Sequence, residues 1–329
     1  MTTSSPAPPP SLERVSTGGG RAAGGRTIDT SDASLGTRLR RGRAGTALTG
    51  AGKGALRTFG IVTASQRRPP ELLVIGAKRG GTTSLWKYLD SHPGILPTFP
   101  RAEQIKGTYF FDEEWGRGER WYRSHFPIDH TRSKAARDLG YDPITFEASP
   151  YYLFHPHAPA RAHQVVPNAV IVALLRDPVE RAFSHYKERR NHTEPLSFAD
   201  ALAAEAERTG GEEARMLADP SVVSMPHRHQ TYVAQSRYAP MLERWFDAYG
   251  PDRILVTAAE DFYADPQAFC DQITRKVGLP RHDLGTPEPF NSEPSADMDP
   301  EVRAHLRASL REDIEAVEAL LGRPMPWAR

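Results

Sequence analysis

The chain has 329 residues, of which 39% are hydrophobic and 25% charged, and its mean hydropathy is −0.54. These values are ordinary for a globular protein and exclude a collagen, a membrane channel and a wholly disordered chain. The net charge of +1 gives no argument for nucleic acid as a partner. A single cysteine, Cys270, cannot form an internal disulfide, which fits a reducing compartment, and we expect a cytoplasmic protein.

The first 70 residues differ from the rest of the chain. They hold eleven Lys and Arg against three acids, a net charge of +8, which leaves −7 for the remainder. Phe59 is their only aromatic residue, and a segment with so little apolar surface does not offset its ordering entropy. We therefore expect residues 1–70 to form a basic, disordered arm. Roles as a transit peptide, or in contacting a membrane surface or a partner, are the alternatives.

Neither a secretory signal nor a membrane span is expected. No apolar segment follows Met1, and no run of about 18 apolar residues is present. From residue 71 onward the sequence predicts one large domain.

Strands and helices alternate in this domain. Continuous apolar runs predict strands at residues 72–75, 144–146, 169–175 and 253–257. Runs without alternation are typical of a parallel sheet that is covered by helices on both faces. Helices are expected over residues 82–89, before His92-Pro93-Gly94, and around 238–249, where apolar residues recur at helical spacing. The fold class is therefore α/β, with three layers.

A phosphate-binding loop is predicted after the first strand, where the sequence reads G-A-K-R-G-G-T-T-S. Glycines let backbone N–H groups converge on phosphate oxygens, and the helix N-terminus adds partial positive charge. The nucleotide-binding P-loop reads G-x-x-x-x-G-K-[ST]. The two outer glycines have that spacing, but Thr82 takes the lysine position and the cations, Lys78 and Arg79, come earlier. The loop is P-loop-like and is expected to bind a different set of oxygens.

A second block follows the strand at residues 169–175. Asp177 is predicted as a helix N-cap, Pro178 as the first helical residue and Glu180 as the capping-box partner. This places Arg176 at the carboxyl end of the strand and Ser184 about two turns along the helix. A guanidinium and a hydroxyl suit phosphate oxygens.

Together the two blocks resemble the sulfotransferases that use 3′-phosphoadenosine 5′-phosphosulfate (PAPS), in particular the heparan-sulfate and carbohydrate branch. Their 5′-phosphosulfate loop reads K-x-G-T-[TR], and their 3′-phosphate motif reads R-[DN]-P-x-E-R-x-x-S-x-Y. Further matches are Y-F-F-D at 109–112, W-Y-R-S-H-F-P at 121–127 and E-A-S-P-Y-Y at 147–152, with weaker ones between residues 238 and 280. The resemblance covers most of residues 71–329, which we therefore expect to form a sulfotransferase domain.

The resemblance implies an enzyme that transfers a sulfuryl group from PAPS to a hydroxyl or amine, without a metal. The acceptor is expected to be a small glycan, glycolipid or metabolite. The implied donor site comprises residues for the 5′-phosphate, for the 3′-phosphate and for the leaving group: Gly80, Gly81, Thr82, Thr83 and Ser84; Arg176 and Ser184; Lys78 and Arg79.

Three positions depart from the family pattern. Arg79, rather than Lys78, aligns with the loop lysine, and a guanidinium gives up a proton less readily than an ammonium. Gly107 stands where the carbohydrate branch has its catalytic glutamate. Ala148 stands where a lysine follows the glutamate of E-K-[ST]-P.

We predict Glu147 as the replacement general base, because it ends a predicted strand at the edge where open α/β sheets bind ligands. A structural carboxylate at this position is the alternative, with Glu103 or His125 as base. Two other functions stay open: a P-loop kinase, which needs the lysine missing at Thr82, and a nucleotide-binding protein without catalysis, which fits the base missing at Gly107.

Overall fold

The apolar runs pair into one five-stranded sheet. The computed structural model describes residues 50–285 and 298–327, all within one compact unit of the chain, Leu48–Arg329. Every strand pairing is parallel, and the strand order is β2-β3-β1-β4-β5. The strands are β1 (Leu72–Gly76), β2 (Ile95–Leu96), β3 (Ile144–Ala148), β4 (Val170–Leu175) and β5 (Ile254–Ala258). The four predicted strands are thus confirmed, with ends shifted by up to two residues.

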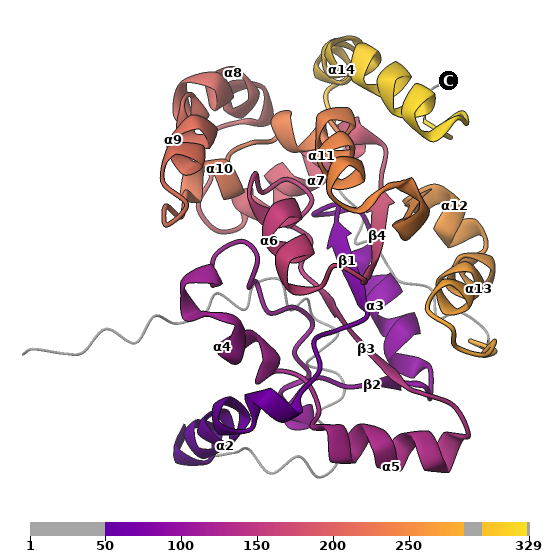
Figure 1. Cartoon of the computed structure of the whole chain (residues 1–329). Coiled ribbons are helices and arrows are strands. Elements are labelled where there is room, and N and C mark those ends of the chain that lie inside the picture. Colours follow the sequence, from indigo (N-terminus) through magenta and orange to yellow (C-terminus); the bar gives the residue numbers. More distant parts are fainter. Residues whose placement is uncertain (1–49, 286–297, 328–329) are drawn as a thin grey trace, which may run out of the picture. The chain divides into compact units, whose positions relative to one another are not determined.

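Helices cover both faces of the sheet, so the predicted α/β fold with three layers is confirmed (Figure 1). Leu73 and Ile75 of β1 belong to one buried cluster, and Leu72 and Val74 to another, because side chains alternate along a strand. The first cluster includes side chains of α6 (Ala158–Val165), α7 (Pro178–Arg190), α11 (Ala239–Tyr249) and α14 (Pro300–Leu321). The second includes side chains of α3 (Thr82–Ser91), α12 (Ala259–Ala264) and α13 (Pro266–Lys276).

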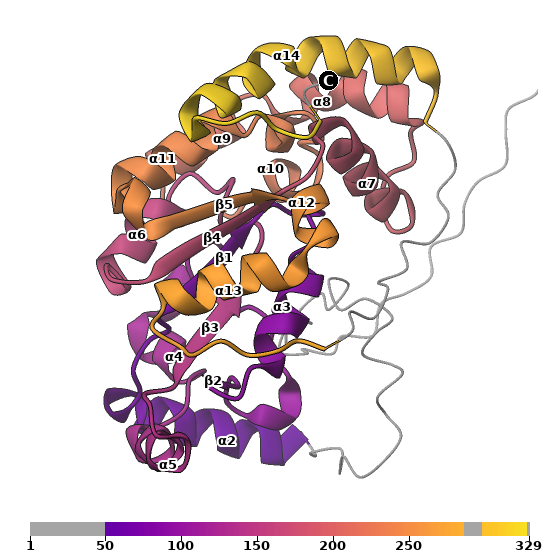
Figure 2. The same ribbon diagram turned by 90° about the vertical axis from the view of Figure 1, so that its right-hand side faces the viewer.

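Figure 2 shows the sheet between α11 and α14 on one side and α3 and α13 on the other. The remaining α-helices are α2 (Gly50–Val62), α4 (Glu119–Arg123), α5 (Asp129–Leu139), α8 (Phe198–Thr209), α9 (Glu212–Ala218) and α10 (Met225–His229). Short 3₁₀ segments are η2 (Ala64–Gln66), η3 (Arg101–Glu103), η4 (Trp115–Arg117), η5 (Ala234–Ser236) and η6 (Pro251–Arg253). No helix in the described ranges is both long enough and apolar enough to cross a membrane.

The start of the folded part lies earlier than predicted. Residues 50–70, assigned above to a disordered arm, contain α2 and η2. Arg57 donates a 2.6 Å hydrogen bond to Glu103, and Arg67, 1% exposed, lies 4.4 Å from the centroid of the Phe99 ring. Burial lowers the pKa of Arg67 to about 10. Long-range partners order this stretch despite its poor apolar content, while residues 1–49 lie outside the described residues.

Candidate active site

The predicted phosphate loop lies between β1 and α3, at the carboxyl edge of the sheet. The Ala77 N–H donates a 2.7 Å hydrogen bond to the Leu174 carbonyl of β4. A Cβ on Gly80 would lie 2.4 Å from the same carbonyl oxygen, and Gly81 has a φ of +94° at the N-cap of α3. Both positions therefore require glycine. The loop is held against β4, with the helix N-terminus behind it.

The two loop cations approach α7. Lys78 has a side chain only 5% exposed, and its Nζ lies 3.6 Å from Oε1 of Glu188. Arg79 is 43% exposed, and its Nε donates a 3.1 Å hydrogen bond to Oγ of Ser184. The structure thus brings together the loop expected to hold the 5′-phosphate and the helix expected to hold the 3′-phosphate.

A third cation, Lys106, contacts the start of α3 and was not among the residues predicted for the site. Lys106 Nζ donates hydrogen bonds to Oγ1 of Thr82, at 3.1 Å, and to Oγ1 of Thr83, at 2.9 Å. Thr82 occupies the position that is a lysine in the P-loop pattern. Lys106, from a separate segment, thus brings an ammonium group to this position. The available signal in the sequence was its position directly before Gly107, where the carbohydrate branch has its catalytic glutamate.

At Gly107 the chain runs against the end of β3. Lys106 O accepts a 2.8 Å hydrogen bond from Ala148 N. A Cβ on Gly107 would lie 2.4 Å from Ser149 Oγ and 2.5 Å from the Ala148 carbonyl oxygen. This position has no room for any side chain unless the backbone shifts, so the glutamate of the family pattern does not fit here.

The Glu147 carboxylate is enclosed. Its Oε2 accepts hydrogen bonds from Thr108 N and Oγ1, both 2.7 Å, and from Ser149 Oγ at 3.1 Å. Its Oε1 accepts from the hydroxyls of Tyr122, at 2.9 Å, and Tyr152, at 3.2 Å. Burial raises the pKa of Glu147 while these hydrogen bonds oppose the rise. With 0% exposure, the carboxylate offers an acceptor no approach, which fits the structural alternative rather than the predicted base.

The other two base candidates are also engaged elsewhere. Glu103 forms the ion pair with Arg57 described above. The buried His125 ring has its Nδ1 2.9 Å from the Trp121 carbonyl oxygen, and burial lowers its pKa to about 4.

The helix α7 begins as predicted, with one difference. Asp177 Oδ1 accepts from Val179 N at 2.8 Å and from Glu180 N at 3.3 Å, which confirms the N-cap. The capping-box prediction for Glu180 is wrong, because this side chain pairs with Arg303. Instead, Glu260 at the start of α12 accepts the hydrogen bond from Asp177 N, at 3.1 Å. Arg176 is therefore followed directly by the N-cap residue of α7, whose backbone N–H is hydrogen-bonded to α12.

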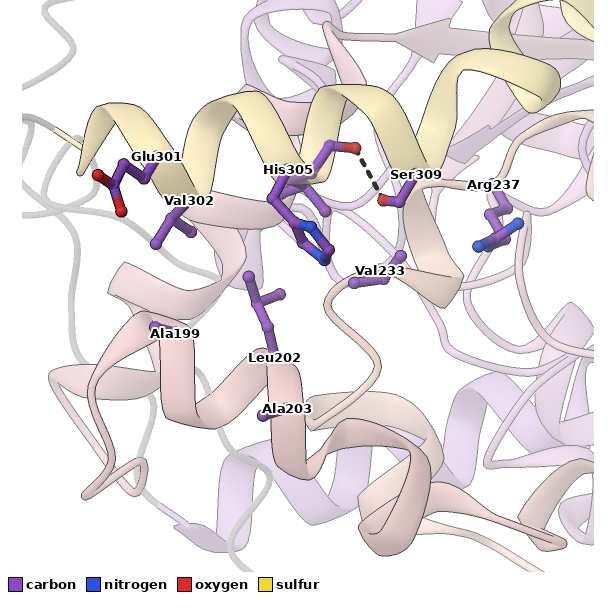
Figure 3. A pocket seen from close by; sticks show the side chains of 10 residues that line it. Ala199, Leu202, Ala203, Val233, Arg237, Glu301, Val302, His305 and Ser309 are labelled. Atoms are coloured by element: carbon purple, nitrogen blue, oxygen red, sulfur yellow. Dashed lines mark hydrogen bonds between the residues drawn. The ribbon is translucent and has the colours of Figure 1, made fainter.

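A cavity of about 450 Å³ lies away from these residues, between α8 and α14. Figure 3 shows Leu202 of α8 and Val302 and His305 of α14 pointing into it. Its lining includes none of the predicted site residues. In the part of the chain that the structure describes, no three His, Cys, Asp or Glu side chains gather to hold a metal ion. Metal-free chemistry stays a prediction.

A loop that gathers cations and hydroxyls at the carboxyl edge of a parallel sheet defines an anion-binding α/β protein. The profile of the sulfotransferase family matches residues 70–283, and the chain belongs to this family.

Comparison with individual proteins agrees with this membership. The bifunctional heparan sulfate N-deacetylase/N-sulfotransferase 3 of Homo sapiens is 31% identical over 229 residues, which are 68% of this chain and 24% of that protein. The related enzyme 4 of Mus musculus is 29% identical over 65% of this chain and 23% of its own length. The chain thus spans about a quarter of the length of these curated relatives. The crystal structure of a sulfotransferase from Alicyclobacillus acidocaldarius covers 79% of this chain and 99% of its own, with 27% identity and a TM-score of 0.56.

Proposed function

We propose that this chain transfers a sulfuryl group from PAPS to an amine or hydroxyl of a glycan and releases adenosine 3′,5′-bisphosphate. The observation that carries the proposal is the convergence of three cations on one loop. Lys106 contacts the hydroxyls of Thr82 and Thr83, and Lys78 and Arg79 extend from the loop toward α7. This donor set is positively charged and rich in N–H and O–H groups, so it fits a nucleotide with several anionic groups.

Each part of the proposed donor site has its own task. The amides and hydroxyls of residues 80–84 hold the 5′-phosphate at the N-terminus of α3. Arg176 and Ser184 hold the 3′-phosphate. Since sulfuryl transfer resembles phosphoryl transfer, with a loose in-line transition state, the protein contributes mainly positioning and charge stabilisation. Lys106, together with Lys78 and Arg79, stabilises the charge that develops on the leaving phosphate.

The names of the relatives support an amino sugar as acceptor. The human and mouse proteins are named as heparan sulfate N-sulfotransferases, and N-sulfation takes place at an amine. The kinase alternative fits less well, because Arg176 directly follows β4, where a kinase needs an acid that binds magnesium. Cytoplasmic location and a role of the basic arm, residues 1–70, in contacting a membrane or partner stay predictions.

A transfer assay tests the proposal. The full chain is incubated with radiolabelled PAPS and with amino-sugar oligosaccharides, their N-acetylated counterparts, glycolipids and small alcohols. We expect label in the free-amine oligosaccharide; label in the N-acetylated one as well identifies a hydroxyl acceptor.

The controls separate catalysis from binding. Arg176→Ala should abolish most of the transfer, while Arg253→Ala, at the amino end of the neighbouring strand β5, should not. If adenosine 3′,5′-bisphosphate binds but no acceptor is labelled, the chain is a nucleotide-binding protein without catalysis and the proposal is wrong.

A further inference from the structure

The proposed reaction lacks a proton acceptor among the residues considered so far. Position 107 has no room for a side chain, and Glu147 is enclosed by five hydrogen bonds. Glu103 and His125 are held by other groups. A carboxylate that faces the phosphate loop and keeps a free acceptor atom would fill this role.

Glu188 meets the first condition. It lies in α7, four residues after Ser184, so both side chains are on the same face of the helix. Its Oε1 is 3.6 Å from Lys78 Nζ, and its Oε2 is 3.9 Å from Arg79 Nη1. Both cations belong to the loop that holds the donor in the proposed function, and the inference rests on that function.

Glu188 also meets the second condition. Oε1 accepts a 3.1 Å hydrogen bond from Arg189 Nη2. Oε2 is buried, and among the described residues it has no hydrogen-bond partner. Buried polar atoms are almost always paired, so an unfilled acceptor beside two loop cations calls for an explanation. Unlike the Glu147 carboxylate, which five hydrogen bonds enclose, Oε2 of Glu188 lies 3.9 Å from the side chain of Arg79, which is 43% exposed. A movement of this one side chain toward the bound donor would open Oε2 to the acceptor.

We propose that Glu188 is the general base of this sulfotransferase. Its carboxylate takes the proton from the acceptor O–H or N–H while the acceptor oxygen or nitrogen forms a bond to sulfur. The bond between sulfur and the oxygen of the 5′-phosphate breaks, and the electron pair leaves with that oxygen. Glu188 then releases the proton to solvent. The products are the sulfated acceptor and adenosine 3′,5′-bisphosphate.

The test compares Glu188→Gln with Glu180→Gln, a carboxylate in the first turn of the same helix that pairs with Arg303. Turnover with PAPS and an amino-sugar oligosaccharide is measured together with the dissociation constant of adenosine 3′,5′-bisphosphate. Loss of a general base typically lowers turnover by about 10²–10⁴-fold, and we expect this for Glu188→Gln with the dissociation constant within a few-fold of wild type. Glu180→Gln should leave both quantities unchanged.

Two further measurements distinguish a general base from a carboxylate with a structural role only. Glu188→Asp retains a carboxylate and should keep more turnover than Glu188→Gln. The acidic limb of the pH–rate profile should disappear in Glu188→Gln only.

Turnover of Glu188→Gln within threefold of wild type would overturn the proposal. So would a tighter dissociation constant with full turnover, since Glu188 would then only neutralise the loop cations in the absence of the donor. If the wild-type chain does not bind adenosine 3′,5′-bisphosphate, the proposed function fails, and this inference with it.

Discussion

Two carboxylates, one at the end of β3 and one in α7, have different surroundings. Glu147, at the end of β3, accepts five hydrogen bonds and has no exposed surface. Glu188, in the third turn of α7, lies beside Lys78 and Arg79 and has one oxygen without a hydrogen-bond partner in the described structure. The comparison teaches that a place at the ligand-binding edge of the sheet is not sufficient for catalysis. The group must also keep an unused acceptor atom.

The two sites should therefore respond differently to mutation. Changes around Glu147 should reduce the stability of the fold and leave donor binding intact. Changes in the phosphate loop and on α7 should reduce binding or turnover and leave the fold intact.

The largest effect is expected for Glu147→Ala. It leaves five buried donors without an acceptor, and removing one side of such a buried charged network costs about 3–5 kcal/mol. Chemical denaturation should show this loss in the free energy of unfolding, while Glu315→Ala, at an exposed site in α14, should show none. An unchanged free energy of unfolding together with lost turnover would contradict a structural role and would support Glu147 as the base.

Lys106→Ala tests the proposed donor site, where an effect on turnover and not on stability is expected. Removing one group that stabilises transition-state charge typically lowers turnover by about 10²–10³-fold, and we expect a loss of this size. The free energy of unfolding should change by less than about 1 kcal/mol, as for most changes outside the core. Steady-state kinetics and denaturation of the same preparation measure both, with the exposed Lys134→Ala as control. Unchanged turnover would remove Lys106 from the site.

The pH dependence of stability gives a second test of the buried region around Glu147. His125 Nδ1 lies 3.2 Å from the carbonyl of Tyr122, a partner of Glu147, and burial lowers the His125 pKa from 6.5 to about 4. The folded state therefore favours the neutral ring. Its contribution to stability is present above pH 6.5 and is lost as the pH falls toward 4, by about 1.4 kcal/mol per pH unit.

Denaturation of wild type and His125→Gln between pH 7 and pH 4 measures this contribution. The free energy of unfolding of the variant should fall with decreasing pH less steeply than that of wild type, by about 1.4 kcal/mol per pH unit, the slope that one proton contributes. Parallel curves would show that the ring does not titrate with unfolding.

The smallest effect is expected for Asp177→Ala. Loss of the α7 N-cap costs about 1 kcal/mol, and the same loss is expected for Asp265→Ala, which caps α13. Only Asp177 adjoins Arg176, so Asp177→Ala alone should also weaken the binding of adenosine 3′,5′-bisphosphate, by a few-fold. Equal binding by both variants would show that the cap does not position Arg176.

Much of the fold could be predicted because its signals are local. The apolar runs of β1, β4 and β5, the glycines of the loop and the Asp-Pro cap of α7 are each readable from a few consecutive residues. The same holds for the order of the two motifs, which identified the family.

The remainder depends on partners far apart in the sequence. Residues 50–70 are ordered by contacts of Arg57 and Arg67 with Glu103 and Phe99, which no local composition shows. The Asp177 N–H donates its hydrogen bond to Glu260 of α12, and not to Glu180 three residues further on. The positions of Lys106 over the loop hydroxyls and of Glu188 beside the loop cations arise only when the strands are assembled.

The most direct test of the donor site is a thermal titration of the full chain with adenosine 3′,5′-bisphosphate and, as matched ligand, adenosine 5′-phosphate, which lacks the 3′-phosphate. At a hundredfold excess over the dissociation constant, a ligand stabilises the fold by about 2.7 kcal/mol. The account predicts a shift of this size for the bisphosphate, a much smaller one for the monophosphate, loss of the difference in Arg176→Ala and its retention in Arg253→Ala. Equal shifts for the two ligands, or an undiminished difference in Arg176→Ala, would contradict the account.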